Sequence, residues 1–324
     1  MPRLRRSNCE HPGYTRLRWG KGFSYRGLRG EVLKDPAELR RIRALAIPPA
    51  WQDVWISPYA NGHIQATGQD GAGRRQYIYH PQWRQMKDRE KFDRALEFAQ
   101  ALPSARRIIT KYLRSDGNGP ERALAAALRI VDSGALRVGG SRYAEMNGSY
   151  GTTTLRVEHV QVRDTRLLLD FPGKSGQEWH VELDDEDLVA ALAPMLERPD
   201  PDTALAYVGV DGQWHSIDAS QLNGFLREVT NGDFSAKDFR TWQATVSAAM
   251  GFARAARTAS TKRAQQQAVA QTIREVAERL GNTPAVARKS YVDPRLVDRF
   301  LDGEVIPVAG YSASETAVRE LLSE

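Results

Sequence analysis

The sequence predicts an α+β fold, with a small β-rich domain first and a larger, mainly helical domain after it. Up to about residue 85, apolar residues fall in short runs separated by Gly, Pro and Asn, as in strands and their turns. From residue 88 onward, apolar residues three and four positions apart predict helices. A strand-like stretch interrupts these helices between about 152 and 183. We place the boundary between 80 and 90, which gives domains 1–85 and 86–324.

The first domain contains four expected strands and one expected helix. The strands are 22–27, 54–57, 63–67 and 75–79. The helix is 35–46, because Pro36 lies in its first turn and Pro48 and Pro49 follow its end.

The second domain contains six expected helices, at 88–101, 120–133, 185–196, 220–230, 235–256 and 260–280. Pro120 begins the second of them and Gly134 follows it. Ser235, followed three residues later by Asp238, predicts a capping box at the start of the fifth.

The interruption between the helices predicts a β-hairpin. The strand-like runs 166–171 and 178–183 flank the turn residues 172–177, with Lys174 at the tip. A lysine there can give a proton to a leaving oxygen if its surroundings lower its pKa from about 10.4. Exposed hairpin tips also carry lysine for solubility alone, so both roles stay open.

The overall composition is that of a globular protein, with 41% apolar and 27% charged residues. No run approaches the roughly 18 apolar residues of a membrane span, and the basic N-terminus lacks the apolar core of a secretory signal. Cys9 is the only cysteine, which excludes an internal disulfide and disfavours a zinc site. We therefore expect no metal, no membrane association and a cytoplasmic location.

Positive charge is concentrated at the front of the chain. Residues 1–114 contain 23 Lys and Arg against 10 Asp and Glu, a net charge of +13, whereas the remaining residues carry a net charge of −7. Such an asymmetry favours a polyanionic partner, because each neutralised phosphate releases counterions. A basic surface without a partner remains the alternative on charge alone.

A tyrosine near the end of the chain, Tyr291, is the candidate nucleophile. A phenol has a pKa near 10, so it attacks a phosphodiester only beside groups that absorb charge. Arg137 and Arg240 are candidates for holding the nonbridging oxygens of the transition state, because arginine stays charged and donates from a planar fork. Taken alone, each arginine could equally be a surface or salt-bridged residue.

With these residues, several further motifs resemble those of the small type IB DNA topoisomerases of poxviruses and bacteria. The resemblance runs from about residue 19 to 302. Its motifs are Arg137-Val138-Gly139 with Tyr143, the segment 147–156 followed by His159, Lys237-Asp238-Phe239-Arg240-Thr241, Lys289-Ser290-Tyr291 and, in the front domain, 47–56 and 76–79. Any one of them could arise by chance, but their ordered set identifies the family.

The resemblance implies a C-shaped clamp around duplex DNA, with the β-rich domain on one side and the catalytic domain on the other. Tyr291 would form a 3′-phosphotyrosyl link, Arg137 and Arg240 would stabilise the transition state, and Lys174, assisted by Arg137, would protonate the leaving 5′-oxygen. The broken strand would swivel, relax supercoils and be religated without ATP, metal or other cofactor. We expect a monomer that acts on DNA in a bacterial nucleoid.

Six further residues are expected to contact DNA. Gln76, Tyr77 and Tyr79 match a poxvirus motif that touches bases and backbone in the major groove. Strand alternation puts the two tyrosines on one face and Gln76 on the other, so part of this motif could instead face the core. The other three are Arg142, Tyr143 and Lys237, which are expected to hold phosphates.

At one position, Asn282, the chain departs from the poxvirus pattern, which has a histidine there. A side-chain amide can donate to a phosphate oxygen but carries no charge. The alternative is structural, since Gly281 and Asn282 could end one helix while Thr283-Pro284 begins the next.

Two other classes of protein share part of these features. A tyrosine recombinase or integrase-like strand transferase also uses Arg, Lys, Arg and Tyr. That class expects His-x-x-Arg where this chain has Lys237-Asp238-Phe239-Arg240, and its N-terminal domain is helical. A non-catalytic DNA-binding protein would explain the charge but would leave the nucleophile set unused.

Overall fold

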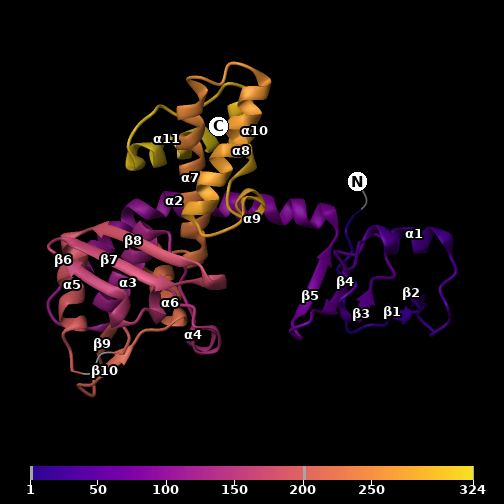
Figure 1. Cartoon of the computed structure of the whole chain (residues 1–324), viewed down its shortest axis with the longest axis horizontal. Helices are drawn as coiled ribbons and strands as arrows, with labels where there is room; N and C mark the ends of the chain where they lie inside the picture. The colour runs from indigo at the N-terminus through magenta and orange to yellow at the C-terminus, as the bar shows by residue number, and fades with distance from the viewer. Residues whose placement is uncertain (1–2, 200–201, 324) are drawn as a thin grey trace. The chain divides into compact units, whose positions relative to one another are not determined.

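The computed structural model describes residues 3–199 and 202–323. Contacts between Cα atoms divide the chain into two compact units, one with residues up to Lys91 and one from Phe92 onward. The first unit is built on an antiparallel sheet, and the second is mainly helical with small sheets (Figure 1). The predicted α+β fold class is therefore confirmed, while the C-shaped clamp stays a prediction.

The first unit is a five-stranded antiparallel sheet in the order β2-β1-β3-β4-β5, with one helix. Its elements are β1 (Tyr14–Trp19), β2 (Gly22–Arg26), α1 (Pro36–Ala44), β3 (Gln52–Ile56), β4 (Ile64–Gln69) and β5 (Arg75–Tyr79). Its core contains Ile42 of α1 and Val54 and Ile56 of β3, with Ile78 of β5 packed against them. The sheet is therefore covered by α1 on the face to which Ile78 points.

Strand β1 was not expected from the sequence, because a charged residue occupies a position where a strand usually places an apolar one. Arg16, in the middle of the strand, is buried. Its guanidinium donates to the backbone oxygens of Ile47 and Pro48 at 3.0 Å each and of Trp51 at 2.8 Å. A buried cation is tolerated here because backbone carbonyls satisfy it.

The second unit contains the remaining elements. They are α2 (Pro81–Leu113, which begins in the first unit), α3 (Pro120–Gly134), α4 (Ser141–Asn147), β6 (Val160–Arg163), β7 (Arg166–Pro172), β8 (Glu178–Asp184), α5 (Glu186–Leu196), β9 (Ala206–Val208), β10 (Trp214–Ser216), α6 (Ala219–Thr230), α7 (Ala236–Ala256), α8 (Lys262–Arg279), α9 (Pro284–Ser290), α10 (Pro294–Leu301) and α11 (Tyr311–Ser323). All six helices expected in this region are present. Helix α9 begins at Pro284, as the structural alternative for Asn282 expected, and α4, α10 and α11 are additional.

The second unit has a sheet layer and a helical layer. The antiparallel sheet β6-β7-β8 packs on α3 and α5, and its inward residues Leu167 and Leu169 belong to the same core as Leu128 of α3 and Leu188 of α5. Helix α7 packs against α8, α10 and α11, which gather beside it in Figure 1. Helix α7 also contacts α3 and α6, so it joins the two layers.

Helix α2 is much longer than the sequence predicted, since it continues through Pro103 to Leu113. A proline inside a helix removes one backbone hydrogen bond and costs about 3 kcal/mol. Leu102, Ala105 and Ile109, on either side of and beyond this position, are almost completely buried. Burial of these side chains offsets the cost of the proline. Because this burial depends on contacts with distant segments, the sequence near Pro103 could not reveal it.

The predicted hairpin is formed by β7 and β8, which pair in register from Arg166 opposite Asp184 to Pro172 opposite Glu178. Between them, residues Lys174–Gly176 form a single 3₁₀ turn. The loop closes where the Gly173 N–H donates to the Gln177 oxygen at 2.8 Å. Lys174 is therefore exposed at the tip of the hairpin, as expected.

Candidate active site

Tyr291 lies directly after the short helix α9. The helix starts with Thr283 as its capping residue and Pro284 at its first position. The Tyr291 N–H donates to the Ala287 oxygen at 3.0 Å, and its carbonyl accepts from Thr245 Oγ1 of α7 at 3.2 Å. The residue is only 8% exposed. The tyrosine is thus fixed by its own helix and by α7.

Arg240 is buried in the first half of α7, whose capping box forms as predicted, with Ser235 N–H donating to Asp238 Oδ2 at 2.8 Å. Its Nη2 donates to the Leu280 oxygen at 2.6 Å and its Nη1 to the Ala135 oxygen. Its guanidinium lies 5.4 Å from the centre of the Tyr291 ring. These carbonyls, at the ends of α8 and α3, aim the guanidinium beside the tyrosine.

Arg137 follows α3 after a sharp turn of the backbone, in which Ala135 adopts a left-handed conformation with φ 54°. The chain then packs against the turn at 151–154, where the Thr152 N–H donates to the Arg137 oxygen at 2.9 Å. Gly139 has φ +92°, and a Cβ on it would lie 2.7 Å from Thr154 Oγ1. Two motifs that are separate in the sequence therefore form one compact support for Arg137.

Asn282 lies beside Arg137, although the two are far apart in sequence. Arg137 Nη2 donates to Asn282 Oδ1 at 2.9 Å. Asn282 Nδ2 lies 3.3 Å from the Leu280 oxygen, the same oxygen that accepts from Arg240. The structure thus brings Tyr291, Arg137, Arg240 and Asn282 together.

The charges of the two arginines change the acidity of the nucleophile. Burial raises the pKa of the Tyr291 phenol, but the charges of Arg240 and Arg137, in that order, outweigh burial and lower it below its usual value; Lys237 adds to the effect. Burial and the charge of Arg137 lower the pKa of Arg240 to about 10. The lowered pKa of Tyr291 favours a phenolate next to the arginines.

Lys174 is not part of this cluster. Among the residues that the structure describes, its side chain forms no hydrogen bond or ion pair with the other four. Its hairpin nevertheless packs beside the Asn282 loop. Gly281 has φ +57°, and a Cβ added there would lie 2.7 Å from Gln177 Oε1 and 2.7 Å from Trp179 Cζ2.

Of the three residues expected to hold phosphates, Lys237 and Arg142 lie on exposed positions of the second unit. Lys237 is exposed in the first turn of α7, close enough to lower the pKa of Tyr291. Arg142 is exposed in the first turn of α4. Tyr143 belongs to the same helix, but its side chain is not among those that the structure describes.

The tyrosine pair of β5 lies as strand alternation predicted. Tyr77 and Tyr79 are 41% and 36% exposed, and their rings stack with centres 5.9 Å apart. Gln76 is on the other face with Ile78, and its Nε2 donates to Asp70 Oδ2 at 2.9 Å. The tyrosines are therefore available for contacts, whereas Gln76 already has a partner.

Sequence reasoning missed the groups that hold the arginines in place. Backbone oxygens of Ala135 and Leu280 accept from Arg240, and the hydroxyl of Thr245 holds the nucleophile by donating to the backbone oxygen of Tyr291. Backbone carbonyls have no sequence signal. Thr245 could have been suspected only as a polar residue within the apolar α7.

The arrangement offers a nucleophile with lowered pKa beside two fixed cations, which suits attack on a phosphodiester. Within the described residues, no group of three or more His, Cys, Asp and Glu side chains could hold a metal ion. In the same part of the chain, no helix has the length and apolar character needed to cross a membrane.

Comparison with known proteins covers both units. Residues 80–299 match the family model "Eukaryotic DNA topoisomerase I, catalytic core", and residues 22–70 match "Bacterial DNA topoisomerase IB, N-terminal domain". DNA topoisomerase 1B of Acanthamoeba polyphaga mimivirus is 30% identical over 291 residues, which are 86% of this chain and 85% of the viral protein. DNA topoisomerase 1B of vaccinia virus (strain Copenhagen) is 21% identical over 94% of both chains.

Among solved structures, a XerH site-specific recombinase bound to its difH substrate aligns with 60% of this chain and 51% of its own, with a TM-score of 0.36 and 13% identity. This similarity is too low to bear on fold or function.

Proposed function

Since the chain belongs to the type IB DNA topoisomerases, an assignment that rests on matches over most of its length, we propose that it relaxes supercoiled duplex DNA through a covalent phosphotyrosine. The observation that carries this proposal is the convergence of Tyr291, Arg240 and Arg137, with a lowered pKa at the tyrosine. The same family assignment disfavours a recombinase and a non-catalytic DNA-binding protein.

In the proposed cleavage step, the Tyr291 oxygen attacks a backbone phosphorus after the phenol loses its proton to solvent. A bond forms between that oxygen and phosphorus as the bond to the 5′-oxygen breaks, which leaves a 3′-phosphotyrosyl link. Arg240 and Arg137 stabilise the negative charge that develops on the nonbridging oxygens. Religation is the reverse step.

We assign Lys174 the role of protonating the leaving 5′-oxygen. Its position on an exposed hairpin tip, packed beside the Asn282 loop through Gln177 and Trp179, supports this role. When DNA enters, the lysine has only to swing over the scissile phosphate, because its hairpin is already anchored next to the site.

Asn282 is proposed to act on the same phosphate as Arg137. Its amide oxygen accepts from Arg137, which fixes the guanidinium. Its Nδ2 makes only a 3.3 Å contact with the Leu280 oxygen, so a phosphate oxygen can replace that weak acceptor. Such a donor adds to transition-state stabilisation without adding charge.

DNA contacts are proposed for both domains, taken as 1–85 and 86–324. Lys237 and Arg142 are exposed cations that can pair with phosphates, and Tyr143 is retained with them on the family resemblance. Tyr77 and Tyr79 present a stacked and exposed pair, and Gln76 can leave Asp70 for a base edge. The excess of positive charge in residues 1–114 supports a DNA-facing role for the first domain.

We expect neither ATP nor a metal to be required. Exchange of one phosphodiester for another conserves the bond energy, and two arginines supply the charge that a cation would otherwise provide. One chain contributes all the groups named above, which favours a monomer. The match of residues 22–70 to a bacterial domain favours an enzyme that acts on nucleoid DNA in a bacterial cytoplasm.

The proposal is tested by incubating the protein with negatively supercoiled plasmid in the presence of EDTA and without ATP. We expect a ladder of progressively relaxed topoisomers. A plasmid that stays supercoiled at saturating protein, or that relaxes only when ATP is added, would contradict the proposal.

A further inference from the structure

The C-terminal helix α11 (Tyr311–Ser323) lies beyond every residue that the proposed reaction uses. It packs against α7, with Ser314, Glu315, Val318 and Leu322 on its buried face. Glu315 is 7% exposed. A buried carboxylate is costly unless it is paired, so its partners show what this helix is attached to.

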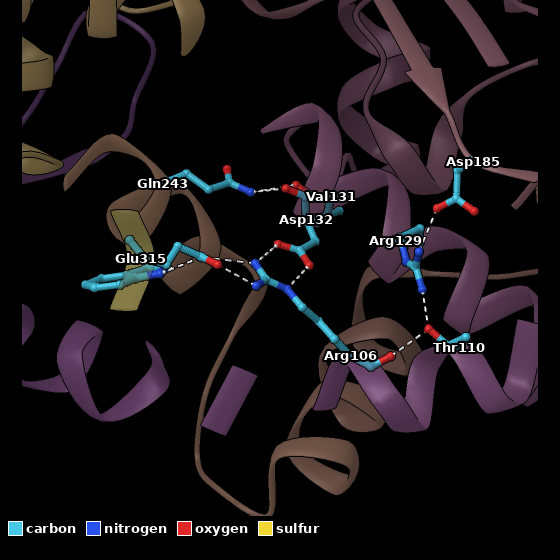
Figure 2. Close-up of polar contacts among 9 residues, drawn as sticks. Arg106, Thr110, Arg129, Val131, Asp132, Asp185, Gln243 and Glu315 are labelled. Atoms are coloured by element: carbon cyan, nitrogen blue, oxygen red, sulfur yellow. Dashed lines mark hydrogen bonds and ion pairs between the residues drawn. The ribbon is translucent and has the colours of Figure 1, made fainter. Parts of the chain in front are cut away.

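Figure 2 shows these partners. Glu315 Oε2 accepts from Arg106 Nη1 at 2.6 Å, and Glu315 Oε1 accepts from Arg106 Nη2 at 3.1 Å and from Trp242 Nε1 at 2.9 Å. Arg106 also donates to both carboxylate oxygens of Asp132, at 2.7 and 2.9 Å. One guanidinium of α2 is thus shared between a carboxylate of α3 and one of α11.

The opposite charges in this cluster favour the arrangement in which Arg106 is bonded to both Asp132 and Glu315. Asp132 and Glu315 are buried and Arg106 is half-buried. Burial opposes the charge on Arg106, but hydrogen bonds to Asp132 and Glu315 and their charges outweigh it, so the pKa of Arg106 is raised. Loss of either carboxylate would leave a donor fork of the guanidinium without its acceptor.

The cluster joins α7, which carries Arg240, to the end of α3, which leads into Arg137. Trp242 is two residues after Arg240 on α7, and Asp132 is five residues before Arg137 at the end of α3. The next side chain on α7, Gln243, donates to the backbone oxygens of Val131, at 3.3 Å, and of Asp132. Glu315 therefore fixes α7 through Trp242 and reaches α3 through Arg106 and Asp132, and Gln243 fixes α7 directly against the end of α3.

We propose that Glu315 is a positioning residue for DNA cleavage, which holds α7 and the end of α3 in register so that Arg240 and Arg137 meet at one phosphate. This inference rests on the proposed cleavage role of the two arginines. It gives the chain after Asp302 a function: through Glu315, α11 completes the support of the two arginines.

A positioning role for Glu315 predicts a specific effect on the rates of cleavage and religation. Cleavage and religation pass through the same transition state, so a residue that acts only by placing Arg240 and Arg137 affects both rates equally. The equilibrium between covalent and noncovalent complexes then stays unchanged. A purely structural role would instead lower the melting temperature and the fraction of active enzyme without changing the rate constant.

The test uses full-length Glu315→Ala, with Glu320→Ala as the matched control, since Glu320 is an exposed glutamate of the same helix. Covalent adduct on plasmid DNA is trapped with detergent at short times, under saturating enzyme. We expect Glu315→Ala to slow the approach to equilibrium on the order of 10-fold to 10²-fold, the range for a slight misplacement of catalytic groups. The final adduct level and DNA affinity should match those of Glu320→Ala.

Two milder variants keep the test valid if Glu315→Ala is unstable. Glu315→Gln keeps an acceptor for Trp242 and should retain more of the rate. Trp242→Phe keeps an aromatic ring in the core, removes the N–H together with part of the buried indole, and should slow both cleavage and religation. A wild-type rate constant in the folded fraction of all three variants would overturn the inference.

If the proposed role of the two arginines in cleavage is wrong, the experiments give a different result. If Arg240→Ala cleaves at the wild-type rate, the role of the arginines is wrong, whatever the Glu315 variants do. If Arg240→Ala is inactive while the Glu315 variants cleave normally, only the role of Glu315 is wrong.

Discussion

Arg137 and Asn282 are joined by a hydrogen bond of 2.9 Å from Nη2 to Oδ1. Because arginine can only donate, the amide oxygen must face it, and the amide nitrogen points away. Thr283 provides the cap of α9, with its side chain accepting from the Val286 N–H. As the structural alternative expected, Gly281 and Asn282 end α8, with the Asn282 N–H donating to the Ala277 oxygen at 2.9 Å, and Thr283-Pro284 begin α9. The side chain of Asn282 also accepts from Arg137, so the residue belongs both to the helix end and to the arginine cluster.

Replacement of Asn282 should impair catalysis. Asn282→Ala removes both the acceptor that fixes Arg137 and a donor for the phosphate, so we expect cleavage to fall about 10² to 10³-fold, the range for one preorganised donor. Asn282→His should retain much of the activity, since an imidazole N–H can donate and its charged form adds attraction below about pH 6.5. Single-turnover cleavage measures both effects.

The control for this prediction is Thr283→Ala, which removes the helix cap next door. It should lower stability by about 0.5 to 2 kcal/mol and leave cleavage unchanged below the melting temperature. An Asn282→Ala enzyme that loses stability but cleaves normally would place Asn282 with Thr283 as a structural residue.

Lys174→Ala should slow cleavage by roughly 10² to 10⁴, as expected for the loss of a general acid. A substrate with sulfur at the 5′-bridging position should restore the rate, because sulfur leaves without being protonated. Equal defects on the oxygen and sulfur substrates would mean that Lys174 binds DNA and does not transfer a proton.

Gly281→Ala should displace the Lys174 hairpin. The added Cβ would lie 2.7 Å from both Gln177 Oε1 and Trp179 Cζ2. We expect slower cleavage of ordinary DNA and a smaller defect on the 5′-sulfur substrate, which does not depend on the lysine. Gly303→Ala is the matched control, since Gly303 also has positive φ, at +88°, but no atom within 4 Å of the added Cβ. A similar effect of both substitutions on cleavage would exclude displacement of the hairpin as the cause.

The pH dependence of cleavage should reflect the lowered pKa of Tyr291. On the 5′-sulfur substrate, the rate should rise with pH as the phenolate forms and level off below the usual tyrosine pKa of about 10. Lys237→Ala removes one of the charges that lower this pKa, so its plateau should begin at higher pH. Rates measured under saturating enzyme test this, and a profile displaced to lower pH by Lys237→Ala would contradict it.

The sequence was sufficient to predict the fold class, most helices and the residues of the cluster. Tyr291, Arg137 and Arg240 were found because they lie in short motifs whose order identifies the family. Their supports were not found, because backbone oxygens such as that of Leu280 and long-range pairs such as Arg106 with Glu315 leave no local pattern.

The errors in secondary structure have the same origin. Helix α2 continues through Pro103 because Leu102 and Ile109 are buried in the core, and β1 contains Arg16 because backbone oxygens satisfy it. In both segments, tertiary contacts outweigh the local preference, which is against helix at Pro103 and against a buried strand position at Arg16.

The most direct test of the central claim is covalent capture of DNA by Tyr291. Wild-type protein mixed with duplex DNA and quenched with detergent should yield an adduct, and digestion should leave the nucleotide on the peptide that contains Tyr291. Tyr291→Phe keeps the ring and should bind DNA with nearly unchanged affinity but form no adduct and relax no plasmid. An adduct at the wild-type level with Tyr291→Phe, or a nucleotide attached to another residue, would contradict the account.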